Sequence, residues 1–431
     1  MLLRIAVNNF LSFFEEVSFD MFPNPKRKLF QSHIHNERVP LLKQAAIYGE
    51  NGAGKSNFVK ALWFLKSFVE QSGFISHKDN LEEYRFQLAE ETNLPIIIKV
   101  EFCQNDDYYI YEIELRDYPI ERFWKSGIGE KDNELLFERN GSNLSSALVS
   151  HSESAKQLLR KNRWASLLSL NKTFPVLNNC KALTDITDWF SNLEVVAINS
   201  EIPVLIDLMS RNPSILEFAN QILQNVGIAN SLQVKETPLE EWLMHEKNAT
   251  EIRQIIANSR IDEHSSLAVS QNNRVTCNFT VNKGVKIVQE FIFEQLGVRG
   301  FRRGMNIASQ SDGTVRLLTL IPAFYKAMKS KSLVVIDEIE HSIHPNLIYK
   351  MVKYYAENVA KGQIIFTTHL TRFQNQQELM RPDELWKTEK VNGCTTMRSF
   401  NDYNIHQTMN IEKGYNEGRY GGVPIISQNF D

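Results

Sequence analysis

The chain has 431 residues, of which 42% are hydrophobic and 23% are charged, and its formal net charge is −3. This composition is that of a folded globular protein, and the small net charge means that any contact with nucleic acid must be a local patch. The four cysteines are far apart and form no CxxC pair, which excludes a disulfide scaffold and a cysteine zinc module. No apolar run approaches the roughly 20 residues of a membrane span. We therefore expect a cytoplasmic protein with no membrane partner.

The predicted elements begin with two short strands within residues 2–22, where apolar and polar residues alternate. A buried strand over 44–49 is followed by a glycine-rich turn and by a helix over 56–72 with apolar residues at helical spacing. Residues 94–138 are rich in β-formers between turn residues, which predicts an antiparallel meander.

The middle of the chain changes in character. Segments between 145 and 260 have helical patterns without sustained heptads, which favours a compact helical insertion over a coiled-coil arm. Strand patterns return at 276–281 and 286–296. From residue 309 onward, helices alternate with the apolar strands 332–337 and 363–368, as in a parallel sheet with crossover helices.

The strongest chemical signal is the segment GENGAGKS, residues 49–56. It fits the pattern G-x-x-x-x-G-K-[ST] and lies between a predicted strand and a predicted helix. The glycines allow a tight turn whose N–H groups converge on phosphate, and the helix start adds positive potential. We expect Lys55 to reach the β- and γ-phosphates of ATP and Ser56 to bind Mg²⁺. The nucleotide-binding residues are predicted to be Gly49, Asn51, Gly52, Ala53, Gly54, Lys55, Ser56 and Asn57.

Two carboxylates, Asp337 and Glu338, follow the apolar strand. Ligands of open α/β sheets bind at the carboxyl ends of the strands. We expect Asp337 to hold Mg²⁺, directly or through water, and Glu338 to polarise the attacking water. An Asp-Glu pair alone could equally be a solvated strand end. Its combination with the phosphate motif favours the catalytic interpretation.

Two weaker signals complete the candidate site. His369 follows the next apolar strand and is predicted to contact the γ-phosphate, although a histidine at a strand end is more often structural. Ser311, Asp312 and Gly313 precede a predicted helix. Small residues at a helix start form an anion-binding end, but an ordinary N-cap explains them as well.

Basic residues form two further clusters. One comprises Arg299, Arg302 and Arg303, and the other comprises Lys156, Arg160, Lys161 and Arg163. A solvated surface is the simpler interpretation of both clusters, and a contact with nucleic acid stays possible. The tail residues Tyr415, Arg419 and Tyr420 either dock a partner or hold the tail on its own domain.

The order of these segments resembles the ATP-binding cassette (ABC) class and, within it, the heads of SMC-like proteins. Lys55 and Asp337 are 282 positions apart, further than such parts usually lie in GTPases and small kinases. The resemblance implies that two heads sandwich ATP, with Ser311 and Gly313 of one head at the γ-phosphate bound by the other. It therefore implies a homodimer or higher homo-oligomer, and it assigns to Gln87 the place of the glutamine that binds Mg²⁺. The segment here reads Ser-Asp-Gly-Thr and departs from the Ser-Gly-Gly-Gln of transporters.

Both ends of the chain narrow the resemblance. The opening VNNFLSFFEEVSF is similar to that of RecF-like and OLD-like ATPases, and segments 340–345, 381–386 and 410–424 resemble the C-terminal pattern of the RloA/AbiLi group. That group comprises prokaryotic ATPases of abortive-infection and related antiphage operons. The 62 residues after His369 contain no DxD motif and are too few for the Toprim domain of OLD nucleases. The resemblance thus implies that an effector, such as a nuclease or Toprim-like protein, is a separate partner.

The sequence as a whole predicts an α/β fold: a P-loop ABC-type ATPase head with a mixed β-sheet, a β-rich lobe and a helical insertion. Residues 1–140 and 296–431 are expected to form the head, and residues 141–295 the mainly helical insertion. The predicted function is ATP hydrolysis that gates an effector in antiphage defence, with a RecF-like DNA-repair clamp as the alternative. A transporter motor subunit and a scaffold that binds ATP without turnover are further hypotheses.

Overall fold

The computed structural model describes residues 1–71, 73–91, 93–127, 132–146, 148, 152–175, 177–198, 202–246, 248–258, 267–271, 274–282, 284–358, 360–406 and 408–422. The chain divides into two compact units. Unit 1 contains Met1–Val195, Lys326–Ile339 and Tyr349–Asp431, and unit 2 contains Val196–Tyr325 and Glu340–Ile348. None of the described helices is both long enough and apolar enough to cross a membrane.

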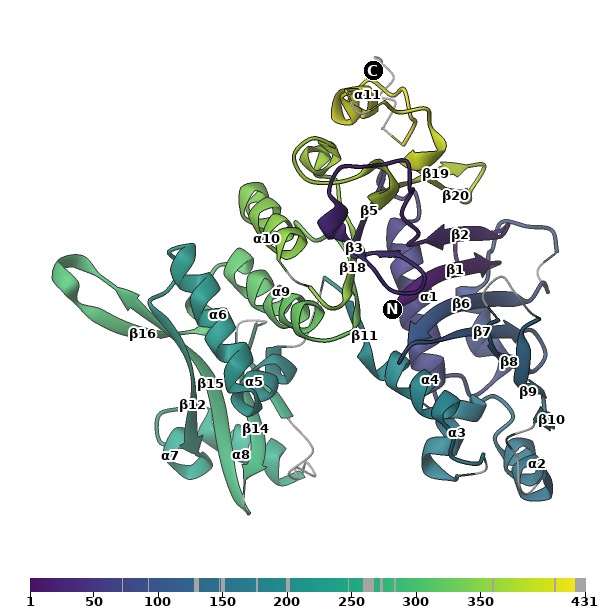
Figure 1. Ribbon diagram of the computed structural model, residues 1–431. Coiled ribbons are helices and arrows are strands. Elements are labelled where there is room, and N and C mark those ends of the chain that lie inside the picture. Colours follow the sequence, from purple (N-terminus) through teal and green to yellow (C-terminus); the bar gives the residue numbers. More distant parts are fainter. Residues whose placement is uncertain are drawn as a thin grey trace, which may run out of the picture. The chain divides into compact units, whose positions relative to one another are not determined.

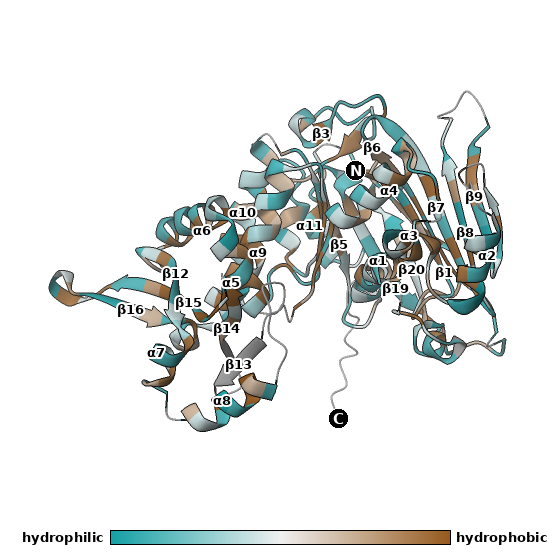
Figure 2. Ribbon diagram, turned by 90° about the horizontal axis from the view of Figure 1, so that it is seen from below, coloured by the Kyte–Doolittle hydropathy of each residue, from teal (hydrophilic) through white to brown (hydrophobic). Residues whose placement is uncertain are grey.

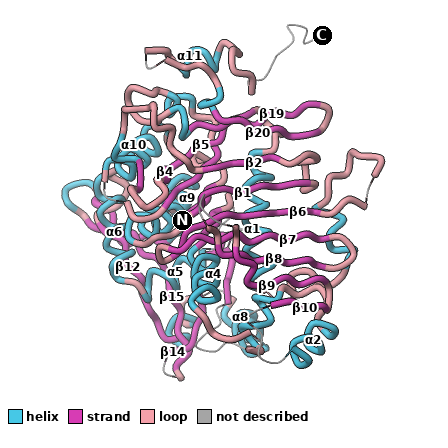
Figure 3. Tube along the Cα trace, turned by 45° about the vertical axis from the view of Figure 1, so that its right-hand side comes forward, coloured by secondary structure: helices cyan, strands magenta, loops and turns pink. Residues whose placement is uncertain are grey.

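A seven-stranded sheet forms the β-rich part of unit 1. Its strands run in the order β10-β9-β8-β7-β6-β1-β2, and neighbouring strands are antiparallel (Figure 3). The strands are β1 (Leu2–Asn8), β2 (Val17–Asp20), β6 (Ile96–Gln104), β7 (Asp107–Leu115), β8 (Pro119–Lys125), β9 (Glu134–Asn140) and β10 (Asn143–Ser146). The predicted meander over 94–138 is therefore part of a sheet that also includes the first strands of the chain.

The second sheet of unit 1 has six strands in the order β11-β17-β18-β5-β19-β20. They are β11 (Leu193–Val196), β17 (Leu333–Ile336), β18 (Gln363–Thr367), β5 (Gln44–Gly49), β19 (Leu385–Val391) and β20 (Cys394–Ser399). Strands β17, β18, β5 and β19 are parallel, while β20 is antiparallel to β19. Every residue of β17, β18 and β5 is buried, as expected for parallel strands covered on both faces. Their apolar residues are among those coloured brown in Figure 2.

Helix α1 (Lys55–Glu70) joins both sheets into one hydrophobic core. Its residue Phe58 packs against Phe19 of β2 at a ring distance of 5.1 Å, and Phe64 packs against Phe10 at 5.3 Å. The same core takes in Ile47 of β5. Burial of this helix between the sheets fixes the position of its first turn, which a short loop over residues 50–54 connects to β5.

Unit 1 also contains further helices and short strands (Figure 1). They are β3 (Ile34–His35), β4 (Leu41–Leu42), α2 (Ser152–Lys161), α3 (Leu167–Thr173), α4 (Lys181–Asn192), α10 (Pro345–Glu357, which begins in unit 2) and α11 (Ile411–Asn416). Short 3-10 helices are η1 (Gln31–His33), η2 (Lys78–Tyr84), η5 (Thr371–Gln374), η6 (Pro382–Glu384) and η7 (Phe400–Asp402).

Unit 2 contains a five-stranded sheet in the order β12-β15-β14-β13, with β16 paired to β15. The strands are β12 (Ser231–Pro238), β13 (Leu267–Gln271), β14 (Arg274–Asn282), β15 (Val285–Leu296) and β16 (Arg302–Asn306). The helical elements are α5 (Ile202–Arg211), α6 (Pro213–Asn225), α7 (Leu239–Leu243), α8 (Ala249–Asn258), η3 (Val298–Gly300), η4 (Ile307–Ser309) and α9 (Asp312–Lys329, which ends in unit 1).

The α/β fold class with a mixed sheet and a β-rich lobe is confirmed. The described part of 141–295 contains helices α2–α8 but also the long strands β12, β14 and β15. Helices α3 and α4 contribute Leu167 and Trp189 to the core of unit 1, and for this reason unit 1 extends to residue 195 and not only to 140. The division into a head and an insertion stays a prediction.

Candidate functional site

The P-loop joins the carboxyl end of β5 to the first residue of α1. Gly49, Gly52 and Gly54 have φ angles of 153°, 78° and 99°. A Cβ atom on Gly54 would lie 2.4 Å from Oγ1 of Thr395, and one on Gly49 would lie 2.3 Å from Oγ1 of Thr388. Glycine is therefore required at positions 49 and 54 for two reasons: a side chain would collide with the threonine beside it, and the positive φ angle disfavours other residues.

Lys55 points back into this loop. Its side chain is only 6% exposed, and Nζ donates hydrogen bonds to the carbonyl oxygens of Gly49 at 2.8 Å and Glu50 at 3.0 Å. The ammonium group is thus held inside the turn of the loop, beside the start of α1, where positive backbone potential also collects.

A set of hydroxyl groups supports the loop from the side of β1 and β20. Oγ1 of Thr395 lies 2.7 Å from Oγ of Ser12 and 3.0 Å from the carbonyl oxygen of Ala53. Asn57, predicted to bind nucleotide, donates from Nδ2 to Oγ of Ser12 at 2.8 Å. The Asn57 amide is therefore engaged with the segment between β1 and β2. The sequence analysis noted the opening segment VNNFLSFFEEVSF, which contains Ser12, but gave no role to Ser12, and it did not single out Thr395.

Ser56 and Asp337 meet because the strands that precede them lie in one sheet. Strand β18 lies between β17, which precedes Asp337, and β5, which leads to the P-loop. Oγ of Ser56 donates a hydrogen bond to Oδ1 of Asp337 at 3.1 Å. The structure thus brings together the two residues that the sequence analysis assigned to Mg²⁺.

Thr367 connects the two carboxylate residues. Its hydroxyl donates to Oδ1 of Asp337 at 2.7 Å and accepts a hydrogen bond of 2.7 Å from the backbone N–H of Glu338. Glu338 has a φ of 45°, in the left-handed region that is unusual for a residue other than glycine. A fully buried threonine therefore fixes both residues. The sequence analysis placed Thr367 in the apolar strand over 363–368 and assigned a role only to His369, which follows that strand.

His369 is exposed and follows β18 at the same edge of the sheet. The backbone before it is fixed, since the N–H of Thr368 bonds to the carbonyl oxygen of Ile47 at 3.1 Å. The structure thus places His369 on the strand between Asp337 and the P-loop. Its contact with the γ-phosphate stays a prediction.

The described hydrogen bonds of the Gln87 side chain are all to its own segment of the chain and not to the candidate site. Its side chain is exposed, and Nε2 donates to the carbonyl oxygens of Glu82 at 2.5 Å and Arg85 at 3.3 Å. Among the described contacts, none joins Gln87 to Ser56 or Asp337. Its role as an Mg²⁺ ligand stays a prediction that requires the loop to rearrange.

The segment of Ser311, Asp312 and Gly313 belongs to unit 2. Oγ of Ser311 accepts from the N–H of Thr314 at 3.1 Å, which is the geometry of a helix N-cap. Ser311 and Asp312 are exposed, and a Cβ on Gly313 would lie 2.6 Å from the carbonyl oxygen of Ser342. The N-cap interpretation is thus correct. A contact with the nucleotide of a second copy is compatible with it and stays a prediction.

The tail packs on its own unit. Tyr415 of α11 donates from its hydroxyl to the carbonyl oxygen of Gly422 at 2.6 Å, and its ring lies 5.7 Å from that of Tyr48. Burial, together with the charges of Glu50 and Glu389, raises the pKa of Tyr415 to about 12. Of the two readings of the tail, the described contacts match attachment to its own domain. Residues 423–424 of the noted tail segment lie outside the described residues.

The oxygen atoms at this site fit a magnesium ion. Mg²⁺ prefers octahedral oxygen coordination at about 2.0–2.1 Å, for which adjacent ligands are roughly 3 Å apart. The distance of 3.1 Å between Oγ of Ser56 and Oδ1 of Asp337 matches that separation. Magnesium sites of this kind use one or two protein ligands and take the others from phosphate and water.

The glycine-rich loop after β5, the buried lysine and the carboxylate on β17 define a P-loop nucleoside triphosphatase. A family model described as "AAA domain, putative AbiEii toxin, Type IV TA system" matches residues 45–373, well over half of the chain. The chain belongs to this family. The match begins in β5 and extends beyond His369.

No curated protein matches the chain. Among solved structures, it is similar to the SMC head domain from Thermotoga maritima, with 13% identity and a TM-score of 0.42, covering 92% of this chain and 98% of that one. It is also similar to an SMC head bound to the C-winged helix domain of ScpA, with 13% identity and a TM-score of 0.40, covering 92% and 97% of the two chains.

Proposed function

We propose that this protein binds ATP with Mg²⁺ and hydrolyses it to ADP and phosphate. The observation that carries the proposal is the contact between Ser56 of the P-loop and Asp337 at the end of β17. This pair of oxygen ligands lies beside Lys55, whose ammonium group is already held at the loop. Membership of the AAA family supports the same class of activity.

Each residue has a distinct role in the proposed reaction. Lys55 leaves the carbonyl oxygens of Gly49 and Glu50 and binds the β- and γ-phosphates. Ser56 and Asp337 hold Mg²⁺, which supplies charge neutralisation at the phosphates when it is bound. Glu338 orients the attacking water and accepts its proton, and His369 donates a hydrogen bond to the γ-phosphate.

We further propose that hydrolysis requires two copies of the chain. Ser311 and Asp312 are exposed at the first turn of α9, so they are accessible to the nucleotide of a second head. The N–H groups at this helix start favour an anion. A homodimer or higher homo-oligomer would then form on ATP and open on hydrolysis.

The proposed role is the control of a separate effector in prokaryotic antiphage defence, in the cytoplasm. The description of the family refers to a toxin of a type IV toxin–antitoxin system, and both ends of the sequence resemble the RloA/AbiLi group. The effector would be a nuclease or Toprim-like protein encoded beside this chain. The RecF-like alternative has the same head; it would be favoured by duplex DNA binding that depends on ATP.

The test of the proposed activity is phosphate release with ATP and Mg²⁺, comparing the wild type with Lys55→Ala. The control is Lys60→Ala, which removes an exposed lysine from the same helix. Loss of turnover in the first variant only is the expected result. Equal turnover in all three proteins would overturn the proposal.

The effector role is tested by co-purification of the protein with the product of the adjacent gene. We expect ATP to control this association, so that the two proteins separate when ATP is added or stay together only in its presence.

A further inference from the structure

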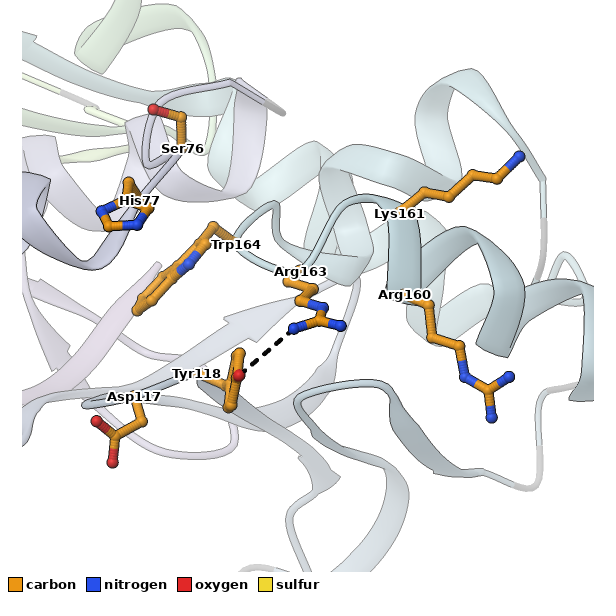
Figure 4. A pocket seen from close by; sticks show the side chains of 8 residues that line it. All are labelled: Ser76, His77, Asp117, Tyr118, Arg160, Lys161, Arg163 and Trp164. Atoms are coloured by element: carbon orange, nitrogen blue, oxygen red, sulfur yellow. Dashed lines mark hydrogen bonds between the residues drawn. The ribbon is translucent and has the colours of Figure 1, made fainter.

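Unit 1 contains a basic and aromatic pocket that shares no residue with the ATP site. It is lined by Ser76, His77, Asp117, Tyr118, Arg160, Lys161, Arg163 and Trp164 (Figure 4). These residues come from the start of η2, from the turn between β7 and β8, and from the end of α2 with the loop that follows.

The charge of the lining is strongly positive. The lining has three exposed basic side chains, Arg160, Lys161 and Arg163, against the one carboxylate of Asp117. Within the described part of the chain, no carboxylate lies within ion-pair distance of these three cations. A cluster of cations that outnumbers the neighbouring acids attracts an anion, most strongly one with several charged oxygens. Guanidinium groups in particular match phosphate oxygens.

Two aromatic rings form the other wall. The centroids of the Tyr118 and Trp164 rings lie 6.2 Å apart, and Tyr118 is 45% exposed while Trp164 is nearly buried. The guanidinium of Arg163 lies over the Tyr118 ring, 5.8 Å from its centre, and Nη1 points to the Tyr118 hydroxyl at 3.5 Å (Figure 4). The pocket thus combines a partly exposed aromatic ring with a cation in contact with it.

A buried ionic network holds both walls in place. Arg139 and Glu121 are fully buried and form an ion pair at 2.6 Å. Arg139 also donates to the carbonyl oxygen of Arg163 at 2.7 Å and to that of Gly141 at 2.8 Å, and Gly141 lies against the side chain of Tyr118. The loop with the cations and the turn with the tyrosine are therefore both tied to Arg139, which makes this a preformed site.

We propose that this pocket binds a nucleotide unit of single-stranded nucleic acid. The backbone phosphates contact Arg160, Lys161 and Arg163, and an unpaired base stacks on Tyr118. A base in a duplex has its faces covered by its neighbours, so an exposed ring beside a basic patch selects an unpaired base. The proposal does not depend on ATP hydrolysis, because none of these residues belongs to the P-loop site.

The experiment is a fluorescence anisotropy titration of the full-length protein with a labelled 20-nucleotide oligo-dT at several salt concentrations. The wild type is expected to bind with a negative slope of log affinity against log salt. The variant R160A/K161A/R163A should bind more weakly, and the steepness of its slope should fall by about 2, since each cation contributes about 0.7 for single strands. The matched control R299A/R302A/R303A removes three exposed arginines, one from the turn before β16 and two from β16, and should keep the slope of the wild type.

A second pair of variants tests stacking. Tyr118→Ala should weaken binding about tenfold, whereas Tyr118→Phe, which keeps the ring, should bind as the wild type does. Phosphate release with ATP should be unchanged in all five proteins.

Absence of binding by the wild type, or equal losses in the two triple variants, would overturn the proposal. So would equal affinity for duplex DNA, for dTMP or for a phosphotyrosine peptide, each of which would assign the pocket to a different ligand.

Discussion

Oγ of Ser56 lies 3.1 Å from Oδ1 of Asp337, although 281 positions separate the two residues in the sequence. The order of three parallel strands accounts for this proximity, because β18 lies between β17 and β5 and all three end at one edge. Two motifs that lie far apart in the sequence thus form one oxygen-lined site beside a lysine.

Replacement of Asp337 by asparagine should reduce ATP affinity in the presence of Mg²⁺ by roughly tenfold or more. The amide keeps the shape of the side chain but removes the charge that attracts the cation. Titration of a fluorescent ATP analogue, with Mg²⁺ and with EDTA, measures the effect. In EDTA the variant and the wild type should bind equally. A variant that retained the full Mg²⁺ dependence would show that Asp337 is not the ligand.

Thr367→Val should lower turnover by roughly ten- to a hundredfold while the protein stays folded. Valine fills the same volume, but it cannot donate to Asp337 or accept from the N–H of Glu338. Steady-state kinetics should show a lower kcat and a higher requirement for Mg²⁺, because the two carboxylates lose their orientation.

Thr367→Ser provides the matched control, since it restores the hydroxyl and should recover most of the turnover. If the valine variant were as active as the wild type, Thr367 would have only a packing role.

Removing one partner of the buried pair of Arg139 and Glu121 should strongly destabilise unit 1. Arg139→Met leaves the Glu121 carboxylate buried without its partner, and such losses cost about 3–5 kcal/mol. Arg122→Met on strand β8 is the control, because Arg122 bonds to Glu112 and Glu138 while partly exposed and should cost about 1 kcal/mol or less. Urea unfolding measures both. Equal losses would contradict this account of the network.

His35 should make the protein less stable as the pH falls below neutral. Burial is the largest cause that lowers the pKa of His35 below its ordinary value of 6.5; the bond to the carbonyl oxygen of Gly362 opposes it, and the charge of Lys43 adds to it. The unfolded chain therefore takes up a proton near pH 6.5 that the folded chain takes up only at lower pH. The free energy of unfolding should fall across that interval.

The matched variant is His35→Gln, which keeps a donor for Gly362 but does not titrate. Unfolding free energies at pH 7.5 and 5.5 should differ less in this variant than in the wild type. A difference as large as that of the wild type would assign the pH dependence to other groups.

The sequence alone predicted the parts of the site that are local motifs. The P-loop between β5 and α1 follows from its glycines and its position between a strand and a helix, and Asp337 follows from the apolar strand before it. The supporting residues Ser12, Thr367 and Thr395 could not be found in this way, because their role depends on strands that become neighbours only in the folded sheet. The strands β12 and β13 within 141–295 were missed since neighbouring helical patterns dominate that region. The attachment of the tail depends on contacts between Tyr415 and Tyr48, which no local pattern predicts.

The most direct test of the central claim is a single-turnover measurement with Glu338→Gln. Glutamine keeps the size of the side chain but cannot accept a proton from water. We expect this variant to bind ATP with Mg²⁺ as the wild type does, to hydrolyse it at least about a hundredfold more slowly, and to elute with ATP as a larger species in size-exclusion chromatography. Hydrolysis at the rate of the wild type would contradict the assignment of Glu338 and, with it, the proposed mechanism.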